Sequence, residues 1–507
     1  MLSAINWLAS WSGRQLEASL LPVHGHLIKK IACYTCQLFR FLLFLPLAAI
    51  LYPLSFTVTR LFSSPPPDSP LVSFAKHPTW RSERLTHSPV EIGFSTAEFQ
   101  DNGPQQHPHT NWGHYFLQAA NRDQLQNRGA FVSSDSYTDD VLPKLKELGC
   151  TKFRFSISRD TIETAPGTFA PLVLEKHAAF CRELIANGIE PMVTLHHFTD
   201  PIGFDWHNVD IESFATYAKE AASALYAAGV RKFLTINEPS VIAFQGWVMG
   251  EFPPHKKCDV EGAALALENM MRVHKRIYED LKGRYGDRIE IGLSHNPLRF
   301  RHFHKMHPLW TPVEKIMCHY FTELNHSALL RFFQTGDFSL QIPFLANYSF
   351  SFGAPPPLDF IGLQYYTDPL IKGSFCTSKW SVSRNPNELT SYEYRLYPQG
   401  LASALEELST LGIPIDITEV GIDTGINPSK ESDEPRIIYF DKLLQVVDRA
   451  LKNSIRVRSL HFWTLYDNIE WHKALSVRFG FIAKDLRPRG AYDWLKTIKK
   501  TTPVTKV

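Results

Sequence analysis

The sequence lacks a strong charge of either sign. Its 53 Lys and Arg residues nearly balance 51 Asp and Glu residues, which leaves a formal net charge of +2 over 507 residues. Charges of both signs are interspersed along the chain, so no extended basic face of the kind that binds nucleic acid is expected. The composition therefore argues against nucleic acid as a partner and favours a polar, largely neutral ligand.

Cysteine is also scarce. The 7 Cys residues are scattered and odd in number, which argues against a disulfide framework in a domain of this size. Cys33 and Cys36 form a C-x-x-C pair, but no βαβ pattern and no second pair accompany them. Histidines such as His274, His295 and His302 show no H-E-x-x-H spacing. We expect no metal and no cofactor.

Long uncharged runs are rare, and one stands apart at residues 41–59, FLLFLPLAAILYPLSFTVT. It is about as long as a bilayer core requires. Pro46 and Pro53 interrupt it, so it fits a kinked span, a re-entrant segment or an interfacial anchor, and equally a hydrophobic helix packed on a catalytic domain. We expect a single N-terminal membrane anchor, with the lipid bilayer as a partner and a membrane as the location.

Three regions follow from this pass along the chain. Residues 1–62 hold the hydrophobic segment, and residues 63–89, which begin SSPPPDSP, form a Pro/Ser-rich linker. Residues 90–500 form the catalytic domain. With 44% hydrophobic and 13% aromatic residues, the chain can bury a large core, and no fixed-period repeat interrupts it.

Short apolar runs alternate with longer amphipathic stretches throughout the third region. Helical stretches end at Gly149 and Gly188, where a helix C-cap favours glycine. This alternation predicts a parallel α/β architecture, and eight units in one domain predict a closed (β/α)8 TIM barrel rather than an open sheet. The eight predicted strands are 91–96, 152–158, 190–195, 232–236, 289–294, 359–363, 413–418 and 459–465.

Two glutamates follow predicted strands at the face where such barrels hold their active sites. Glu238 comes after the fourth strand and Glu419 ends the seventh, so their side chains would face each other across the barrel mouth. Cleavage of a glycosidic bond needs one carboxylic acid and one carboxylate. Arg154, in the second strand, would keep Glu419 ionised, while repulsion between the glutamates would raise the pKa of Glu238.

Several segments, in this order along the chain, resemble family 1 of the glycoside hydrolases, the β-glucosidase family. The resemblance spans roughly residues 90 to 495. It implies a retaining β-glycosidase that works through a covalent glycosyl-enzyme, with Glu238 as acid/base and Glu419 as nucleophile. The segments are RFSIS (154–158), TLHHFTDP (194–201), TINEP (235–239), DFIGLQYY (359–366), ITEVG (417–421) and FWTLYDNIEW (462–471).

The resemblance also implies a set of residues that hold the sugar or support the catalytic pair. Either Tyr366 or Tyr365 would hydrogen-bond the nucleophile, and Trp463 would be the stacking platform. Aromatic faces and planar polar side chains are what a sugar requires. The substrate-binding residues are Gln100, His197, Asn237, Tyr366, Trp463, Glu470 and Trp471, and the supporting residues are Arg154, Tyr365 and Asn296.

Five positions depart from the usual family pattern, and two other functions are considered beside hydrolysis. The departures, which bear on specificity, are Arg159, Phe198, Thr199, Gln364 and Val420. One alternative is a membrane-associated transglycosylase that passes the sugar to a glycolipid or another glycoside. The other is a catalytically silent sugar-binding protein, but such proteins typically lose a catalytic Glu, and both glutamates are present here.

Overall fold

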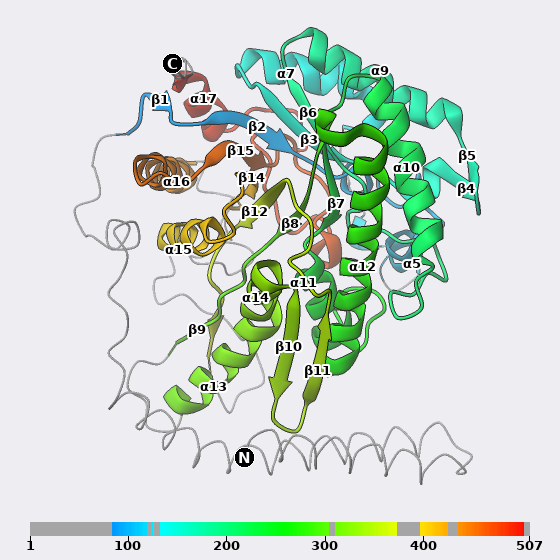
Figure 1. Cartoon of the computed structure of the whole chain (residues 1–507). Coiled ribbons are helices and arrows are strands. Elements are labelled where there is room, and N and C mark those ends of the chain that lie inside the picture. Colours follow the sequence, from blue (N-terminus) through cyan, green and yellow to red (C-terminus); the bar gives the residue numbers. More distant parts are fainter. Residues whose placement is uncertain are drawn as a thin grey trace.

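The computed structural model describes residues 84–118, 121, 123–125, 132–303, 310–372, 396–423 and 433–500. Eight parallel strands close into a barrel, and their order around it follows the chain (Figure 1). The predicted (β/α)8 barrel is confirmed, and all eight predicted strands agree closely with the observed ones. Their bounds are Glu91–Ser95 (β2), Lys152–Ser156 (β3), Glu190–Thr194 (β6), Lys232–Asn237 (β7), Glu290–His295 (β8), Phe360–Tyr365 (β12), Ile415–Val420 (β14) and Val457–Trp463 (β15).

Helices follow every barrel strand and pack on the outside of the sheet (Figure 1). The longer ones are α7 (Leu142–Glu147), α9 (Pro171–Ala186), α10 (Ile211–Ala227), α12 (Val260–Tyr285), α13 (Trp310–Thr322), α14 (Ala328–Thr335), α15 (Pro398–Ser409), α16 (Glu434–Lys452) and α17 (Gly490–Thr497). Shorter helices lie in the loops after β2, β3 and β7: α4 (Glu98–Asn102), α5 (Asn111–Leu117), α8 (Arg159–Ile162) and α11 (Pro239–Ala243).

Local sequence fixes where these helices begin and end. Asp210 and Asp259 cap α10 and α12, because each carboxylate accepts a backbone N–H from the first turn. The two predicted helix ends are confirmed, since Gly149 and Gly188 follow α7 and α9 in the left-handed region, at φ of 66° and 73°.

The barrel interior is layered. Lys232 and Arg458 hold the buried Asp416 carboxylate near the amino ends of the strands. An apolar cluster of Met192, Leu234 and Phe360 lies inside the barrel. Polar side chains, Arg154 and Glu419 among them, occupy the carboxyl end. The bulk of the apolar core lies between the strands and the surrounding helices. This packing holds the strands, and therefore the polar side chains at their carboxyl ends, in fixed positions.

The long connection between β8 and β12 was not predicted. Besides α13 and α14 it contains an antiparallel hairpin of β10 (Asp337–Ile342) and β11 (Ala346–Ser351). Small strand pairs complete the fold: β4 (Glu163–Ala165) with β5 (Thr168–Phe169), β9 (Arg301–His302) with β13 (Leu370–Ile371), and β1 (His87–Ser88) with β16 (Lys499–Lys500).

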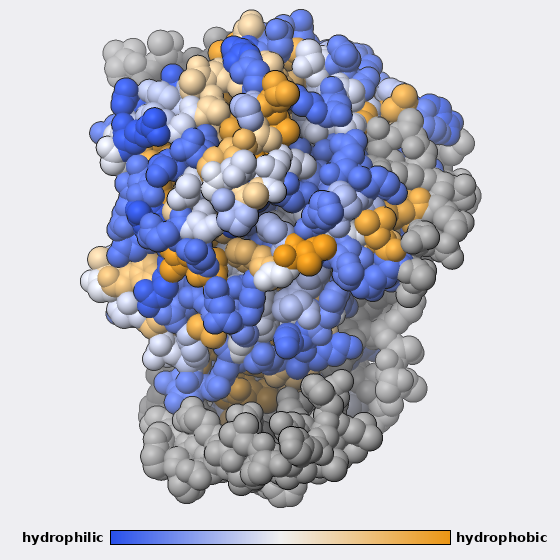
Figure 2. Space-filling view, turned by 90° about the vertical axis from the view of Figure 1, so that its right-hand side faces the viewer, coloured by the Kyte–Doolittle hydropathy of each residue, from blue (hydrophilic) through white to orange (hydrophobic). Residues whose placement is uncertain are grey.

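The predicted membrane anchor and membrane location are corrected here. Across the described parts of the chain, no helix is both long enough and apolar enough to cross a bilayer. The segment on which the prediction rested, residues 41–59, lies outside the described residues, as does most of the predicted linker. On the face seen in Figure 2, hydrophobic residues form separate patches on a mostly hydrophilic surface. We assign neither a membrane location nor a lipid partner.

Candidate active site

Glu238 and Glu419 both line one cavity of about 290 Å³ at the carboxyl end of the barrel. Glu238 directly follows β7, in the left-handed region at φ 44° and ψ 61°. Its N–H donates to the carbonyl of Ser294 on β8 at 3.0 Å. A non-glycine residue with positive φ is uncommon and concentrates at functional sites. The turn directs this carboxyl group into the cavity instead of along the strand.

Glu419, near the end of β14, is buried and fully engaged. Its Oε1 accepts hydrogen bonds from Arg154 Nη1 and from Gln364 Nε2, the latter at 2.7 Å. Its Oε2 accepts a hydrogen bond from the Tyr366 hydroxyl. Three donors, one of them cationic, favour the ionised form of this carboxyl.

Arg154 links four strands of the barrel. Beyond its ion pair with Glu419, its Nε donates to Thr194 Oγ1 at 2.9 Å and its Nη2 donates to Asn237 Oδ1 at 2.6 Å. These partners lie on β14, β6 and β7, while Arg154 itself lies on β3. The planar guanidinium therefore fixes its neighbours in both position and orientation.

Asn237 has only one orientation compatible with these contacts. Its Oδ1 accepts from Arg154 and also from Gln364 Nε2, each at 2.6 Å. The amide nitrogen must then point the other way, where it lies 3.3 Å from His197 Nε2 at the cavity wall. A donor is thus presented to whatever occupies the cavity.

Glu238 has fewer hydrogen-bond donors around its carboxyl group than Glu419, and the pKa values of the two groups differ for this reason. Glu238 Oε1 is buried and has no hydrogen-bond partner. Burial first, and the charge of Glu419 second, raise the pKa of Glu238 well above its ordinary value, against a hydrogen bond from Asn296. Burial also raises the pKa of Glu419, but Arg154 and Tyr366 counter that rise. The repulsion inferred from sequence is therefore the smaller cause, and Glu419 ionises first.

The predicted sugar-binding residues come together, with one exception. His197, Trp463, Glu470 and Trp471 all line the cavity. The His197 ring stacks against both tryptophans at centroid distances of 5.9 and 5.8 Å. Burial lowers the pKa of His197 well below its ordinary value, so its imidazole is neutral. Gln100 does not line the cavity, because its amide nitrogen donates to the carbonyl of Ile469 at 2.7 Å.

The structure distinguishes the two tyrosines. Tyr366 lines the cavity and contacts Glu419, whereas the Tyr365 hydroxyl donates to the carbonyl of Tyr397 at 2.5 Å, away from the carboxylate. Side chains of consecutive strand residues point to opposite faces, so only one of the pair can reach the site. Tyr365 is a buried packing residue.

Two polar residues of the site were not among those predicted. Gln364 contacts both Glu419 and Asn237, and Thr194 holds Arg154. Gln364 was noted only as a departure from the family pattern, although its place beside Tyr366 at a strand end was a usable signal. Further lining residues that were not predicted come from the segments that follow the strands, short helices included: Val241, Phe244, Gln245, Glu251, Phe252, Leu298, Phe300, His472 and Lys473.

Within the described residues, no group of three or more His, Cys, Asp or Glu side chains is arranged to hold a metal ion. Two of the histidines inspected in the sequence, His274 and His295, are buried in the barrel wall. The His274 Nδ1 is hydrogen-bonded to the Thr235 hydroxyl at 2.7 Å, and His295 Nε2 lies 3.0 Å from His326 Nδ1.

Known proteins match this chain over most of its length. It fits the model of Glycosyl hydrolase family 1 over residues 92–330 and 354–501. It is 26% identical over 442 residues to a 6-phospho-beta-galactosidase of Clostridium acetobutylicum, covering 74% of this chain and 90% of that protein. It is 26% identical over 379 residues to beta-glucosidase A of Thermotoga maritima, covering 70% and 82%. A solved beta-glucosidase from Thermotoga maritima, in complex with deoxynojirimycin, shares the fold at a TM-score of 0.68 and 22% identity, covering 82% of this chain and 98% of the other.

Proposed function

The chain belongs to glycosyl hydrolase family 1, and we propose that it hydrolyses neutral β-glycosides with net retention, using Glu419 as nucleophile and Glu238 as acid/base. The observation that carries these roles is the unequal environment of two carboxyls in one cavity. Glu419 accepts three hydrogen bonds, including one from a cation, while Glu238 Oε1 has no partner. Opposed environments of this kind separate an acid from a base.

In the first step, the Glu419 carboxylate attacks the anomeric carbon while the Glu238 carboxylic acid gives its proton to the departing glycosidic oxygen. The glycosidic bond breaks and a glycosyl ester forms on Glu419. In the second step, Glu238, now ionised, takes a proton from water, whose oxygen attacks the anomeric carbon and releases Glu419. Two inversions give net retention.

The neighbours of Glu419 suit this cycle. Arg154 and Tyr366 stabilise the carboxylate before attack and after release, and the same donors hold the carboxyl group in place while it is esterified. The neutral ring of His197, the amide nitrogen of Asn237 and the carboxylate of Glu470 surround the cavity with donors and acceptors for sugar hydroxyls.

The charge of the cavity favours a neutral sugar. Four glutamates line it. Glu238 is the proton donor and carries no charge, and Glu419 is paired with Arg154. Glu251 and Glu470 remain, against one cationic lining side chain, Lys473. The two lining histidines add no charge, because burial lowers the pKa of His472 to about 4 and that of His197 well below its ordinary value. A phosphate on the sugar would bring roughly −1.5 to −2 charges into this acidic cavity. We therefore infer that the substrate is not phosphorylated, unlike that named for the Clostridium relative.

Proton NMR of the reaction with aryl β-glucoside, aryl β-galactoside and an aryl 6-phospho-β-galactoside tests this function. We expect turnover of a neutral glycoside, with the β-anomer of the free sugar formed first and mutarotation later. Initial release of the α-anomer would contradict retention. Faster turnover of the phosphorylated substrate would contradict the neutral glycone. A new glycoside in place of free sugar would identify a transferase.

A further inference from the structure

A second cavity opens beside the active site. It has a volume of about 390 Å³, and its lining shares no residue with the first. Three segments form it: α5 after β2, residues 200–206 after β6, and residues 247–255 after β7. All three follow the carboxyl ends of barrel strands. The second cavity therefore belongs to the same functional face of the barrel.

Three aromatic rings lie between the two cavities. Trp112 contacts Tyr115 of the second cavity at a centroid distance of 5.4 Å and Trp471 of the first at 5.1 Å. Phe252 lies 5.0 Å from Trp112 and 5.4 Å from Phe198. This buried wall separates the second cavity from the outer part of the active site.

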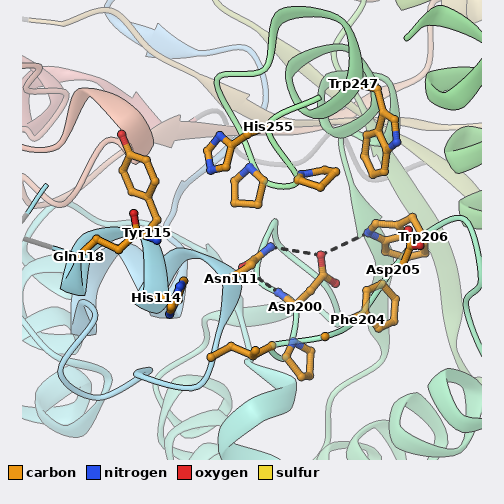
Figure 3. A pocket seen from close by; sticks show the side chains of 15 residues that line it. Asn111, His114, Tyr115, Gln118, Asp200, Phe204, Asp205, Trp206, Trp247 and His255 are labelled. Carbon is orange, nitrogen blue, oxygen red and sulfur yellow. Dashed lines mark hydrogen bonds between the residues drawn. The ribbon is translucent and has the colours of Figure 1, made fainter. Parts of the chain in front are cut away.

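Hydrogen bonds around Asp200 hold the second cavity in shape (Figure 3). Asp200 is bound by three side chains: His196 Nε2 at 2.9 Å, Trp206 Nε1 at 3.3 Å and Asn111 Nδ2 at 3.4 Å. Asn111 Oδ1 in turn accepts the N–H of Asp200 at 3.1 Å. These bonds fix α5 to the segment 200–206 without a ligand. A preformed concave surface is what small-molecule sites usually present.

Aromatic side chains form opposite walls of this cavity. In Figure 3, Tyr115 and His255 lie on one side, and Phe204, Trp206 and Trp247 lie on the other. The rings of Tyr115 and His255 stack at 5.5 Å, and those of Phe204 and Trp206 meet edge to face at 4.9 Å. Trp206 and Trp247 are buried behind this surface, whereas Tyr115 and Phe204 are partly exposed. Exposed aromatic faces of this kind receive the C–H surfaces of a sugar ring or of another flat ligand.

Polar groups also lie at the rim. His114, Gln118 and Asp205 are exposed at the edge of the cavity. The Asp205 carboxylate also accepts the His207 N–H at 2.9 Å and Asn208 Nδ2 at 3.3 Å. The lining contains no Lys or Arg, so it offers an anion such as a phosphate no charged partner. Aromatic walls with hydrogen-bonding groups, carboxylates and no Lys or Arg match a neutral polyhydroxylated ligand better than a fatty or an anionic one.

We propose that this cavity is a second, non-catalytic saccharide-binding site that holds a neutral sugar unit on the Phe204 and Tyr115 walls. It would retain an oligosaccharide or glycoside beside the active site of the same enzyme. The choice of saccharide as ligand rests on the proposed function, whereas the existence of a binding site rests on the cavity itself.

Calorimetric titration with cellotriose, laminaritriose and lactose tests the proposal while saturating deoxynojirimycin fills the first cavity. We expect at least one sugar to give a binding isotherm that persists under this block, with a dissociation constant on the order of 1 mM. Phe204→Ala and, separately, Asp205→Ala should weaken that binding about fivefold or more. Phe352→Ala, at a half-buried phenylalanine that lines neither cavity, should leave it unchanged.

Hydrolysis of an aryl β-glucoside distinguishes failure of this proposal from failure of the proposed function. We expect all three variants to keep kcat/KM close to the unsubstituted value, which also shows that they fold. Absence of a persistent isotherm for all three sugars would overturn the second site, even with hydrolysis intact. Equal binding in both cavity variants and in the control would overturn it too. Asp205 is exposed, so its variant remains informative if Phe204→Ala does not fold.

Discussion

Gln364 shows how much one buried amide can determine in this site. It lies on β12 directly opposite Glu419 on β14, and the strand register shifts at this residue. One Nε2 donates both to Glu419 and to Asn237. It therefore supports the ionised form of Glu419, the proposed nucleophile, and also determines which end of the Asn237 amide faces the cavity.

The pH dependence of kcat/KM gives the first test at this scale. The proposed mechanism needs Glu419 ionised and Glu238 protonated. Activity should therefore fall as pH drops through the pKa of Glu419 and fall again as pH rises through that of Glu238. Because the pKa of Glu238 is raised well above its ordinary value, the basic limb should lie well above pH 4.5.

Gln364→Glu should move the acidic limb of that profile upward by about one pH unit or more. The new carboxyl group would stand where an amide now donates to Glu419, and its negative charge would raise the pKa of Glu419. Gln364→Asn keeps the neutral amide but is too short to bridge both partners. It should lower kcat/KM roughly tenfold with the acidic limb in place. Superimposable profiles for all three proteins would show that Gln364 does not act on the nucleophile.

The place of a side chain could be predicted where it follows a strand directly, but not where a contact depends on packing. The positions of Glu238, Glu419 and Trp463 followed from counting strands. The rotation of Tyr365 away from the site, and of Gln100 toward Ile469, depends on neighbours distant in sequence.

At the scale of elements, Gly421 directly follows β14 and lies against the end of β15. A Cβ atom there would lie 2.7 Å from the carbonyl oxygen of Trp463 and 3.0 Å from Tyr366 Cε1. Both distances are shorter than ordinary van der Waals contact, and one partner is backbone. The close approach of the two strand ends therefore requires glycine.

Gly421→Ala should lower kcat/KM about tenfold or more, because Tyr366 must move from Glu419 or the end of β15 must shift. Gly283→Ala is the matched control. It lies within α12, where a Cβ meets no atom within 4 Å, so it should leave activity unchanged and stabilise the fold by about 0.5–1 kcal/mol. Kinetics and thermal unfolding of both variants check this, and equal activity of the two would contradict it.

Barrel elements were predictable because each strand is a short apolar run between a loop and a helix. The connection between β8 and β12 was not, since its hairpin of β10 and β11 lies outside the repeating unit. Burial alternates along β10: Leu340 and Ile342 are buried, whereas the residues before each of them are exposed. This pattern is typical of an antiparallel pair with one face packed and the other in solvent.

For the whole molecule, the closed barrel needs no further strand to complete it. β15 pairs with β2 and β8 pairs with β12, so no edge of the barrel is left open. The apolar core lies within the described barrel and its helices. The pairing of β1 with β16 and the hydrogen bond from the Leu85 N–H to Asp441 Oδ1, at 2.9 Å, join the two ends of this unit.

Deletion of residues 1–79 should therefore leave hydrolysis within about threefold of the full chain. Deletion of residues 1–89 removes β1 and the bond to Asp441 as well. It should lower the thermal midpoint by roughly 2 °C or more relative to the shorter deletion. Loss of activity in the shorter deletion would show that the barrel depends on the removed residues.

The most direct test of the catalytic assignment is the configuration of the glycosyl azides formed when azide rescues Glu419→Ala and Glu238→Ala. Without the nucleophile, azide should enter from the vacated face and give the α-glycosyl azide from an activated aryl β-glycoside. Without the acid/base, azide should intercept the glycosyl-enzyme on Glu419 from the opposite face and give the β-glycosyl azide. The account predicts azides of opposite configuration from the two variants. The same configuration from both, or full activity in either variant without azide, would contradict it.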